Sequence, residues 1–476
     1  MKNSNLSRRN FLGKATTVGV AGILAPGIIT SCSRETKKVV AVPIMLDQAP
    51  DGKVLKAGLI GCGGRGTGAI NQFLSAGPNL QVVALGDTFM DRIDACRKSI
   101  KEQHKQEVPD EKCFVGFDAY QKVIDAGVDV IILATPPFFR PDHLAAAIAA
   151  KKHVFAEKPV CVDPTGARSV MASAQKAKGM DLCIVTGTQR RHQRNYVANW
   201  QQVAQGAIGD IVGGNVYWNG GMLWFRNNDP KWTEMEWMIR DWVNWAWLSG
   251  DHIVEQHVHN LDVMNWFTGS HPVKAVGFGS RLRRVTGNQY DNFSVDFAFE
   301  NGTHIHSMCR QINGCSGGGV AERLQGTKGS TNCQDTILDL AGNEVWKYEY
   351  PLDKDGKPTE RVSVDPYLQE HIDLVTAIRT GKPINEAENT AISTMVAIMG
   401  RISAYTGKET TYEEMMNSDL KLGPTVFAFG PVDIDKSVPI AGLAYDAAAE
   451  AARTAEREKA RAARAAEAAK TPAATK

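Results

Sequence analysis

The stretch LKAGLIGCGGRG, residues 55–66, decides the fold of this chain. Its first seven residues form a nearly continuous apolar run, which predicts a buried strand, and the GAINQFLSA that follows has helical spacing. A second apolar run, LQVVALGD, ends in Asp87. Strand, glycine loop, helix and a second strand ending in an acid make up the dinucleotide-binding fingerprint. The sequence therefore predicts an α/β fold that starts with a Rossmann domain, a doubly wound parallel sheet.

The residues of this fingerprint have separate physical roles. Gly61 permits the tight turn, Gly63 lets the backbone approach a pyrophosphate, and Gly66 allows close packing of helix on strand. The phosphates would lie at the helix N-terminus, where Arg65 is a further cofactor-binding candidate. Asp87 suits ribose hydroxyls and would repel a 2′-phosphate, so NAD is predicted over NADP.

Two further strands, VDVIILATP and HVFAEKP, end in segments that would lie at the carboxyl edge of the sheet. Ligands bind at that edge in open parallel sheets. We therefore expect Thr135 and Pro136 to line the nucleotide, and Glu157 and Lys158 to reach the nicotinamide end.

Composition narrows the class of protein. The 476 residues are 43% hydrophobic and 22% charged, enough for two globular domains, and a formal charge of +2 gives no reason to expect a nucleic-acid partner. No CxxC pair and no His/Cys cluster with zinc spacing occurs, so no metal site is predicted.

The chain begins with an export-type leader. SRRNFLGKA contains the twin arginines Arg8 and Arg9, and a short apolar run rich in small residues follows. This layout predicts a signal over residues 1–32 that is read by the twin-arginine export machinery, then a polar tether over 33–53. The run ends in ITSCS, which resembles a lipoprotein box, so a lipid on Cys32 is the one membrane link expected. The predicted location is the periplasm or cell envelope.

The ordered series GxGxxG, ATPP with His143, AEKP, GTQRRH and HNLD resembles the glucose–fructose oxidoreductase and inositol dehydrogenase (Gfo/Idh/MocA) family. The resemblance implies a Rossmann domain and then an α/β domain with a large open, mostly antiparallel sheet. We accordingly expect the cofactor domain at 54–180, the substrate domain at 181–430 and an Ala-rich charged tail at 431–476. By analogy with the family, a homo-oligomer is expected.

The resemblance also implies a catalytic set. The lysine of EKP, here Lys158, is a catalytic or substrate-binding group in the family. The family pattern of an acid, a catalytic histidine and an aspartate falls on Glu255, His259 and Asp262. This chain departs from the pattern in having a glutamate at the first position and His257 where glycine is frequent. His257 is therefore an alternative proton acceptor, or a residue that binds substrate.

Chemistry agrees with this assignment. On one helix, Glu255, His259 and Asp262 would share a face at i, i+4 and i+7. A histidine near its normal pKa can take the hydroxyl proton of a secondary alcohol, and Glu255 or Asp262 can fix its tautomer. The Lys158 ammonium can stabilise the developing alkoxide. The alternative is a set of capping and salt-bridge residues on a surface helix.

Further substrate-side candidates are less sharply defined. Arg190, with Arg191 and His192, follows the apolar run LCIVTGTQ. These residues could contact substrate hydroxyls or cofactor phosphates, and could equally belong to a solvated loop. Tyr196 lies one turn further on and is a substrate-binding candidate.

Eight of the ten tryptophans lie between residues 218 and 266. Most are expected in the core, but Trp224 or Trp245 would suit the wall of a sugar pocket.

Three functions are compatible with this sequence. Because no NAD pool exists outside the cytoplasm, an exported enzyme should keep its cofactor bound. The favoured function is oxidation of a secondary alcohol of a sugar, glycoside or cyclic polyol. The alternative is a redox-neutral glycosidase resembling the NAD-using α-N-acetylgalactosaminidases, although that branch lacks the lysine found here as Lys158. A non-catalytic sugar-binding lipoprotein is the third and least favoured, because the fingerprint and the catalytic set are intact.

Overall fold

The computed structural model describes residues 45–442, together with residues 455, 458, 459 and 462. The predicted signal over 1–32, Cys32, most of the tether and nearly all of the tail beyond residue 442 lie outside the described residues. The chain divides into two units, residues 1–38 and 39–476, and every described residue belongs to the second.

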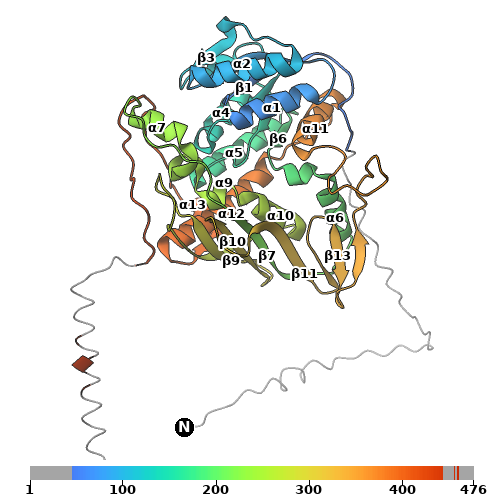
Figure 1. Cartoon of the computed structure of the whole chain (residues 1–476), viewed down its shortest axis with the longest axis vertical. Coiled ribbons are helices and arrows are strands. Elements are labelled where there is room, and N and C mark those ends of the chain that lie inside the picture. The colour runs from blue at the N-terminus through green and yellow to red at the C-terminus, as the bar shows by residue number, and fades with distance from the viewer. Residues whose placement is uncertain (1–44, 443–454, 456–457, 460–461, 463–476) are drawn as a thin grey trace, which may run out of the picture. The chain divides into compact units, whose positions relative to one another are not determined.

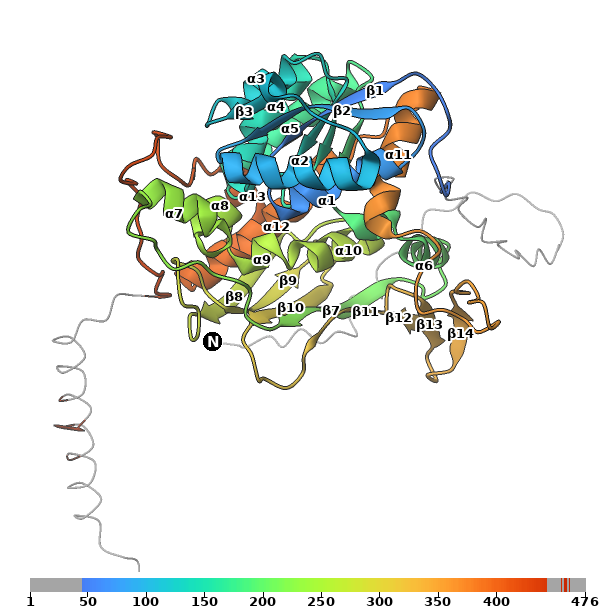
Figure 2. The same ribbon diagram turned by 45° about the horizontal axis from the view of Figure 1, so that its top comes forward.

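The N-terminal domain contains a six-stranded parallel sheet in the order β3-β2-β1-β4-β5-β6 (Figure 1). Helices α1 and α2 pack on one of its faces, and α3, α4 and α5 pack on the other (Figure 2). This confirms the predicted Rossmann fold. The elements are β1 (Leu55–Ile60), α1 (Gly64–Ser75), β2 (Leu80–Asp87), α2 (Met90–His104), η2 (Asp110–Lys112), β3 (Cys113–Val115), α3 (Ala119–Ile124), β4 (Val130–Leu133), η3 (Pro137–Phe139), α4 (Arg140–Ala149), β5 (His153–Ala156), α5 (Pro164–Lys178) and β6 (Ile184–Thr186).

The strand order fixes where a ligand binds. β1 pairs in parallel with β2 on one side and with β4 on the other, so the order of the sheet reverses between β1 and β4. Chain connections leave this point in opposite directions, which opens a crevice at the carboxyl ends of the strands. The glycine loop follows β1 directly and therefore lies in this crevice.

The C-terminal domain contains a nine-stranded sheet in the order β14-β13-β12-β11-β7-β10-β9-β8-β15. β7 and β10 pair in parallel and the other neighbours are antiparallel, which confirms the predicted mostly antiparallel sheet. The elements are η4 (Gln189–His192), α6 (Arg194–Ala204), β7 (Ile211–Gly220), α7 (Glu234–Arg240), η5 (Trp242–Asn244), α8 (Ala246–Ser249), α9 (His252–Glu255), α10 (Val258–Thr268), β8 (Lys274–Ser280), β9 (Asn292–Ala298), β10 (His304–Gln311), β11 (Gly319–Gly326), β12 (Gly329–Thr331), β13 (Thr336–Asp339), β14 (Glu344–Lys347), α11 (Pro366–Thr380), α12 (Ala387–Thr406), β15 (Thr410–Thr411) and α13 (Tyr412–Asn417).

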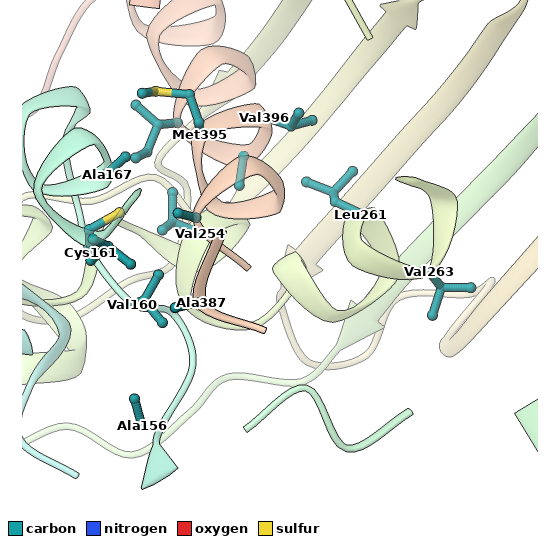
Figure 3. Packing of buried hydrophobic residues seen from close by; sticks show 14 of the residues in the cluster. Ala156, Val160, Cys161, Ala167, Val254, Leu261, Val263, Ala387, Met395 and Val396 are labelled. Carbon is teal, nitrogen blue, oxygen red and sulfur yellow. The ribbon is translucent and has the colours of Figure 1, made fainter. Parts of the chain in front are cut away.

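One core joins the two domains. Helix α12 lies between α5 of the Rossmann domain and strands β8 and β9, and most of its side chains are buried. Met395 and Val396 of α12 lie in the same buried cluster as Ala167 of α5 and Leu261 of α10 (Figure 3). Because this apolar surface is continuous, the end of β5 is held in a fixed position relative to α9 and α10.

Two predicted boundaries and the placement of one helix need correction. β6 belongs to the parallel sheet, so the boundary at residue 180 falls one strand too early. Helix α11, expected within the range 181–430, packs instead on the Rossmann core beside α1 (Figure 1). The tail does not begin at residue 431, because Val432 is buried against residues of α7 and α8. Sequence periodicity identifies a helix, but the sheet that covers it is set by packing of the whole chain.

Within the described residues, no helix is both long enough and apolar enough to cross a membrane.

Candidate active site

A cavity of about 450 Å³ opens at the carboxyl ends of β1, β2 and β4. Every cofactor-binding residue predicted from the sequence lines it except Gly66, Glu157 and Lys158. The other lining residues come from the loop after β3, from η3 and α4, and from a segment of the second domain. The lining comprises Ile60, Gly61, Gly63, Gly64, Arg65, Gly86, Asp87, Thr88, Phe89, Arg92, Gly116, Phe117, Ala119, Tyr120, Ala134, Thr135, Pro136, Phe139, His143, Trp224, Arg226, Ile239, Arg240 and Trp242.

The glycine loop has the shape that a dinucleotide needs. Gly61 has a φ of +95°, and a Cβ there would lie 2.6 Å from the carbonyl carbon of Ala134. A Cβ on Gly66 would clash with the carbonyl oxygen of Gly61, so this glycine lets α1 pack closely on β1. Gly63 and Gly64 face open space, and no side chain caps the N-terminus of α1. The first amides of α1 can therefore donate hydrogen bonds to a pyrophosphate, and the residues present fit the predicted cofactor.

Asp87 ends β2 beside this loop. Its carboxylate accepts hydrogen bonds from the backbone N–H of Cys62 at 2.7 Å and of Phe89 at 3.0 Å. Burial raises the pKa of Asp87, although these two backbone donors favour the charged form. The two N–H groups hold the carboxylate at the cavity wall, where a ribose hydroxyl can donate to it.

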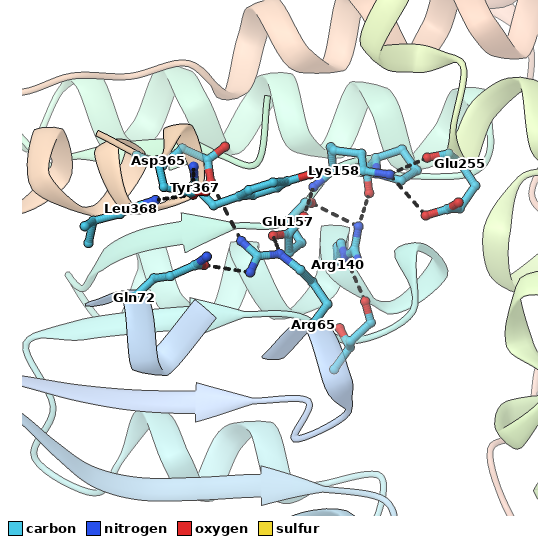
Figure 4. A network of polar contacts seen from close by, with 12 residues as sticks. Arg65, Gln72, Arg140, Glu157, Lys158, Glu255, Asp365, Tyr367 and Leu368 are labelled. Atoms are coloured by element: carbon cyan, nitrogen blue, oxygen red, sulfur yellow. Dashed lines mark hydrogen bonds and ion pairs between the residues drawn. The ribbon is translucent and has the colours of Figure 1, made fainter. Parts of the chain in front are cut away.

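Arg65 and Glu157 connect the glycine loop to the end of β5. The guanidinium of Arg65 forms an ion pair with Glu157, and its Nη1 donates to Gln72 at 2.8 Å (Figure 4). Glu157 is only 3% exposed, so a bound ligand meets Arg65 before it meets Glu157. Both residues were predicted to bind cofactor, and the structure assigns Arg65 to the cavity wall and Glu157 to the layer behind it.

Lys158 follows Glu157 and points towards the second domain (Figure 4). Its Nζ donates to the backbone oxygen of Glu255 at 2.6 Å and to Oε1 of the same residue at 3.1 Å. The two side chains are 11% and 9% exposed, so the ion pair is nearly buried. The structure therefore brings together two of the three residues predicted to be catalytic, one from each domain.

Arg140, at the start of α4, was missed from the sequence. It is buried, and its guanidinium donates to the backbone oxygens of Thr135 at 2.7 Å, Glu157 at 3.0 Å and Pro159 at 2.7 Å. Burial lowers the pKa of Arg140 to about 10, so the group stays charged near neutral pH. Arg140 thus ties the end of β4 to the segment that carries Lys158. The signal available was an arginine just after the ATPP motif.

His259 is buried on α10, with its ring stacked on Trp218 of β7 at 5.6 Å between centroids. Burial, with the charges of Lys158 and Arg190, lowers the pKa of His259 well below its usual value. Its Nδ1 is buried without a hydrogen-bond partner among the described residues. The imidazole is therefore neutral near pH 7, and Nδ1 is a nitrogen left to accept a proton. The expectation of a histidine near its normal pKa does not hold for this buried ring, because burial and the two nearby cations disfavour its charged form.

The segment that carries these residues is not one helix. A turn at Gln256 and His257 separates α9 from α10, so the prediction that Glu255, His259 and Asp262 share one helical face is wrong. The turn bends the chain between the first two, so that Glu255 faces Lys158 while His259 faces Trp218.

Two predicted substrate-binding residues are structural. His257 is fully buried, with Nε2 2.7 Å from the Ser307 hydroxyl and Nδ1 3.1 Å from Oδ1 of Asn260. Asp262 accepts two hydrogen bonds from the Arg191 guanidinium, at 2.7 and 3.0 Å, and is 1% exposed. Asp262 also accepts a hydrogen bond from the Ser393 hydroxyl at 2.8 Å. Both side chains are thus hydrogen-bonded inside the core, and neither lines the cavity.

Arg190 and Tyr196 meet at a carboxylate that the sequence analysis missed. Glu322 of β11 forms an ion pair with Arg190 and accepts hydrogen bonds from Tyr196 at 3.0 Å and Asn260 at 2.7 Å. Burial raises the pKa of Glu322, against the opposing charge of Arg190. An acid at a buried position of an otherwise alternating strand was the available signal. The cluster braces Trp218, which lies 5.8 Å from the Arg190 guanidinium.

Tyr367 was also missed. It lies at the start of α11, and its ring extends towards Lys158 (Figure 4). The Arg65 guanidinium lies 5.0 Å from the centre of that ring, and the side chain is partly exposed. This residue follows a long loop after β14, so no local sequence pattern connects it with the EKP motif.

The described residues contain no group of three or more His, Cys, Asp or Glu side chains placed to hold a metal ion.

Two family models match the chain, one in each of the two domains described above. A family model described as an oxidoreductase family with an NAD-binding Rossmann fold matches residues 55–185. A second model, described as the GFO/IDH/MocA C-terminal domain, matches residues 197–332. The first match covers the parallel sheet as far as β6, and the second covers strands β7 to β12 of the nine-stranded sheet.

Several curated proteins are similar in sequence. Inositol 2-dehydrogenase of Paracoccus denitrificans is 28% identical over 215 residues, which are 44% of this chain and 54% of that protein. Myo-inositol 2-dehydrogenase of Thermotoga maritima is 23% identical over 342 residues, 69% of this chain and 90% of that protein. Glycosyl hydrolase family 109 protein 4 of Phocaeicola vulgatus is 24% identical over 290 residues, 56% of this chain and 51% of that protein. The chain thus spans about half the length of the first and third relatives.

A solved structure shares the fold. Scyllo-inositol dehydrogenase from Lactobacillus casei, crystallised with NAD(H) and scyllo-inositol, matches with a TM-score of 0.55 at 20% sequence identity. The match covers 76% of this chain and 99% of that one.

Proposed function

The chain belongs to the oxidoreductase family with an NAD-binding Rossmann fold and a GFO/IDH/MocA C-terminal domain, and on that premise we propose its reaction. It oxidises a secondary alcohol of a sugar, glycoside or cyclic polyol with an NAD that it keeps bound. The observation that carries this proposal is the nearly buried Lys158–Glu255 pair, which extends from the cofactor domain into the substrate domain. The curated relatives named as inositol dehydrogenases support a cyclic polyol as one member of the substrate class.

The residues divide the work of alcohol oxidation. Bound NAD supplies the hydride acceptor, and Gly61, Gly63, Asp87 and Arg65 are the residues that would hold it. Lys158 donates hydrogen bonds, and its ammonium can stabilise negative charge on the substrate oxygen as the hydroxyl proton leaves. That stabilisation is strong because the pair is almost excluded from water.

Three further residues assist this step. The carboxylate and backbone oxygen of Glu255 hold the Lys158 ammonium in one orientation. His259, kept neutral by burial and by its cationic neighbours, is the group that accepts the proton. Trp218 fixes the plane of the His259 ring and presents an aromatic surface of the kind that sugar rings stack on.

The test uses the mature protein purified without added nucleotide. Denaturation should release NAD in near-stoichiometric amount, and a panel of polyols, sugars and glycosides should include one that produces lasting near-ultraviolet absorbance of reduced nicotinamide. Transient reduction with release of an aglycone would overturn the oxidoreductase proposal in favour of the redox-neutral glycosidase, the function class named by the third relative. A protein that contains no dinucleotide and gains no activity when NAD is added would overturn both.

We also propose that the chain is exported already folded and loaded, by the twin-arginine machinery, and is tethered through a lipid on Cys32. The leader SRRNFLGKA and the ITSCS box support this proposal. Fractionation of cells that express Arg8→Lys/Arg9→Lys should find the protein in the cytoplasm, whereas Cys32→Ala should free it from the membrane fraction. An unchanged distribution in both variants would contradict the proposal.

A further inference from the structure

A segment of the second domain extends over the cofactor cavity. Residues 221–245, which connect β7 to α8 and include α7, contribute Trp224, Arg226, Ile239, Arg240 and Trp242 to the cavity lining. We call this segment the insert. The part of the cavity that it meets contains Asp87, Thr88 and Phe89, the turn that receives the adenosine half of a dinucleotide in this fold.

Arg240 fastens the insert to the Rossmann domain. Its guanidinium donates to the two carboxylate oxygens of Asp91 at 3.1 and 3.2 Å, in the first turn of α2. It also lies 3.9 Å from the centre of the Phe89 ring, which permits a cation–π contact. Asp91 and Phe89 closely follow Asp87, so this attachment lies directly beside the predicted ribose site.

A second segment, residues 418–442, holds the insert from the other side. We call it the strap; it runs beside α7 in Figure 2. Gly430 accepts a hydrogen bond from the Met235 N–H at 3.0 Å, and the Val432 N–H donates to Glu234 at 2.7 Å. Phe429 of the strap lies 5.5 Å from the ring of Phe117, a residue of the cavity wall. The strap therefore contacts both the insert and the Rossmann domain.

The insert presents exposed side chains to the cavity. Trp224 is 46% exposed although it lines a cavity, and its ring packs edge-on against Trp242 at 6.3 Å. The Arg226 guanidinium lies 5.6 Å from the Trp224 ring, and within residues 45–442 no ion pair engages it. An exposed indole next to a cation suits a ligand that carries both a flat heterocycle and phosphates.

We propose that the insert is a lid that closes over the adenosine half of the bound dinucleotide and sets its rate of release. Trp224 and Trp242 contact the adenosine, Arg226 pairs with the pyrophosphate of the dinucleotide, and Arg240 fastens the lid to α2. This inference rests on the proposed function in one respect, that the chain holds NAD. It goes further in assigning cofactor retention to residues outside the glycine fingerprint.

The test measures how fast the cofactor leaves. The purified full-length protein is loaded with NADH and mixed with excess NAD, and the loss of energy transfer from tryptophan to NADH reports release. We expect Arg240→Ala and Trp224→Ala each to release NADH about tenfold faster or more, which corresponds to about 1.4 kcal/mol of lost contact. Arg97→Ala is the matched control. Arg97 lies on α2, the helix that carries Asp91, and it forms an ion pair with Asp110 of η2 at 2.7 Å, but it does not line the cavity.

Two further readouts keep the outcomes separable. Titration with ADP-ribose, which lacks nicotinamide, should show the same loss of affinity in Trp224→Ala as NAD does. Limited proteolysis should cut the insert in the apo protein and spare it when NAD is bound. Release rates in both lid variants equal to wild type, or a loss confined to NAD and absent with ADP-ribose, would overturn the lid. Wild-type protein that binds no dinucleotide would instead overturn the proposed function.

Discussion

Lys158 is positioned by groups on both sides of the domain boundary. Arg140 binds the backbone oxygens before and after it, and Glu255 binds its ammonium. The position of the charge is therefore set by hydrogen bonds that exist before any substrate arrives. Such preorganisation is what makes a single donor effective in a site that excludes water.

Replacing Lys158 by Met should separate chemistry from cofactor binding. The methionine keeps the apolar stem and removes the donor, so we expect kcat to fall by about 10²–10³-fold. NAD content should not change, because Lys158 does not line the cavity. Steady-state kinetics on the best substrate of the panel, with nucleotide content measured on the same preparation, checks this. Lys122→Met, at an exposed ion pair on α3, is the control, and a Lys158→Met enzyme with wild-type kcat would contradict the site assignment.

Replacing Asp87 by Ser tests the cofactor preference. The serine keeps a small polar group but removes the carboxylate held by the Cys62 and Phe89 amides. We expect NAD affinity to fall about tenfold or more, and the ratio of NADP to NAD affinity to rise, because the charge that repels a 2′-phosphate is gone. Calorimetric titration with both nucleotides measures the two affinities. An NAD affinity equal to wild type would show that Asp87 does not bind ribose.

The sequence predicted residues whose role follows from one local motif. Gly61 is required by its positive φ and Gly66 by its close approach to the carbonyl oxygen of Gly61, so the fingerprint was sufficient for both. Glu322 and Tyr367 reach the site only through sheet pairing and the return of α11, which depend on contacts distant in sequence. His257 was over-interpreted for the same reason, since only the fold reveals that Ser307 and Asn260 already bind its ring.

At the scale of elements, the loops after β4 and β5 work as one unit. Arg140 begins the helix between these strands and donates to carbonyls of both loops, so α4 connects the cofactor edge to the catalytic lysine. The sequence predicted α4 and both strands. It did not predict this connection, because an arginine at a helix start is usually exposed and its burial depends on the strands around it.

Substituting Arg140 by Met should therefore cost both stability and rate. Three backbone oxygens would lose a charged donor, and we expect the free energy of unfolding to fall by about 3 kcal/mol. The kcat should fall as well, because the Lys158 segment loses its anchor. Urea unfolding and steady-state kinetics check the two effects. Arg168→Met is the matched control, since Arg168 also donates to three backbone oxygens, those of residues 415, 416 and 418, and does not line the cavity. Equal kcat in the two variants would show that Arg140 does not position the site.

For the molecule as a whole, the histidines set the response to acid. Burial lowers the pKa values of His143, His252, His257, His259 and His371, so the folded protein keeps all five neutral. An unfolded chain takes up these protons as pH falls through about 6.5, which favours unfolding. His192 acts in the opposite direction, because the carboxylates of Glu386 and Asp373 outweigh its burial and raise its pKa. The contribution of His192 to the free energy of unfolding is complete below about pH 6.5 and is lost as pH rises through the higher pKa that His192 has in the folded protein.

His371 is the best place to test this balance. Both of its ring nitrogens are buried without partners among the described residues, and its ring lies 4.2 Å from that of Phe155. Replacing it by Leu removes one proton that the unfolded chain would bind in acid, and it places an apolar side chain in this buried cluster. As pH falls below about 6.5, the free energy of unfolding of His371→Leu should therefore rise relative to that of wild type, by about 1.4 kcal/mol for each pH unit. Urea unfolding at neutral and acid pH measures this gap, with His304→Gln on the exposed face of β10 as the control. A gap that is the same at both pH values would mean that His371 takes up its proton in the folded protein, and that burial does not keep this core histidine neutral.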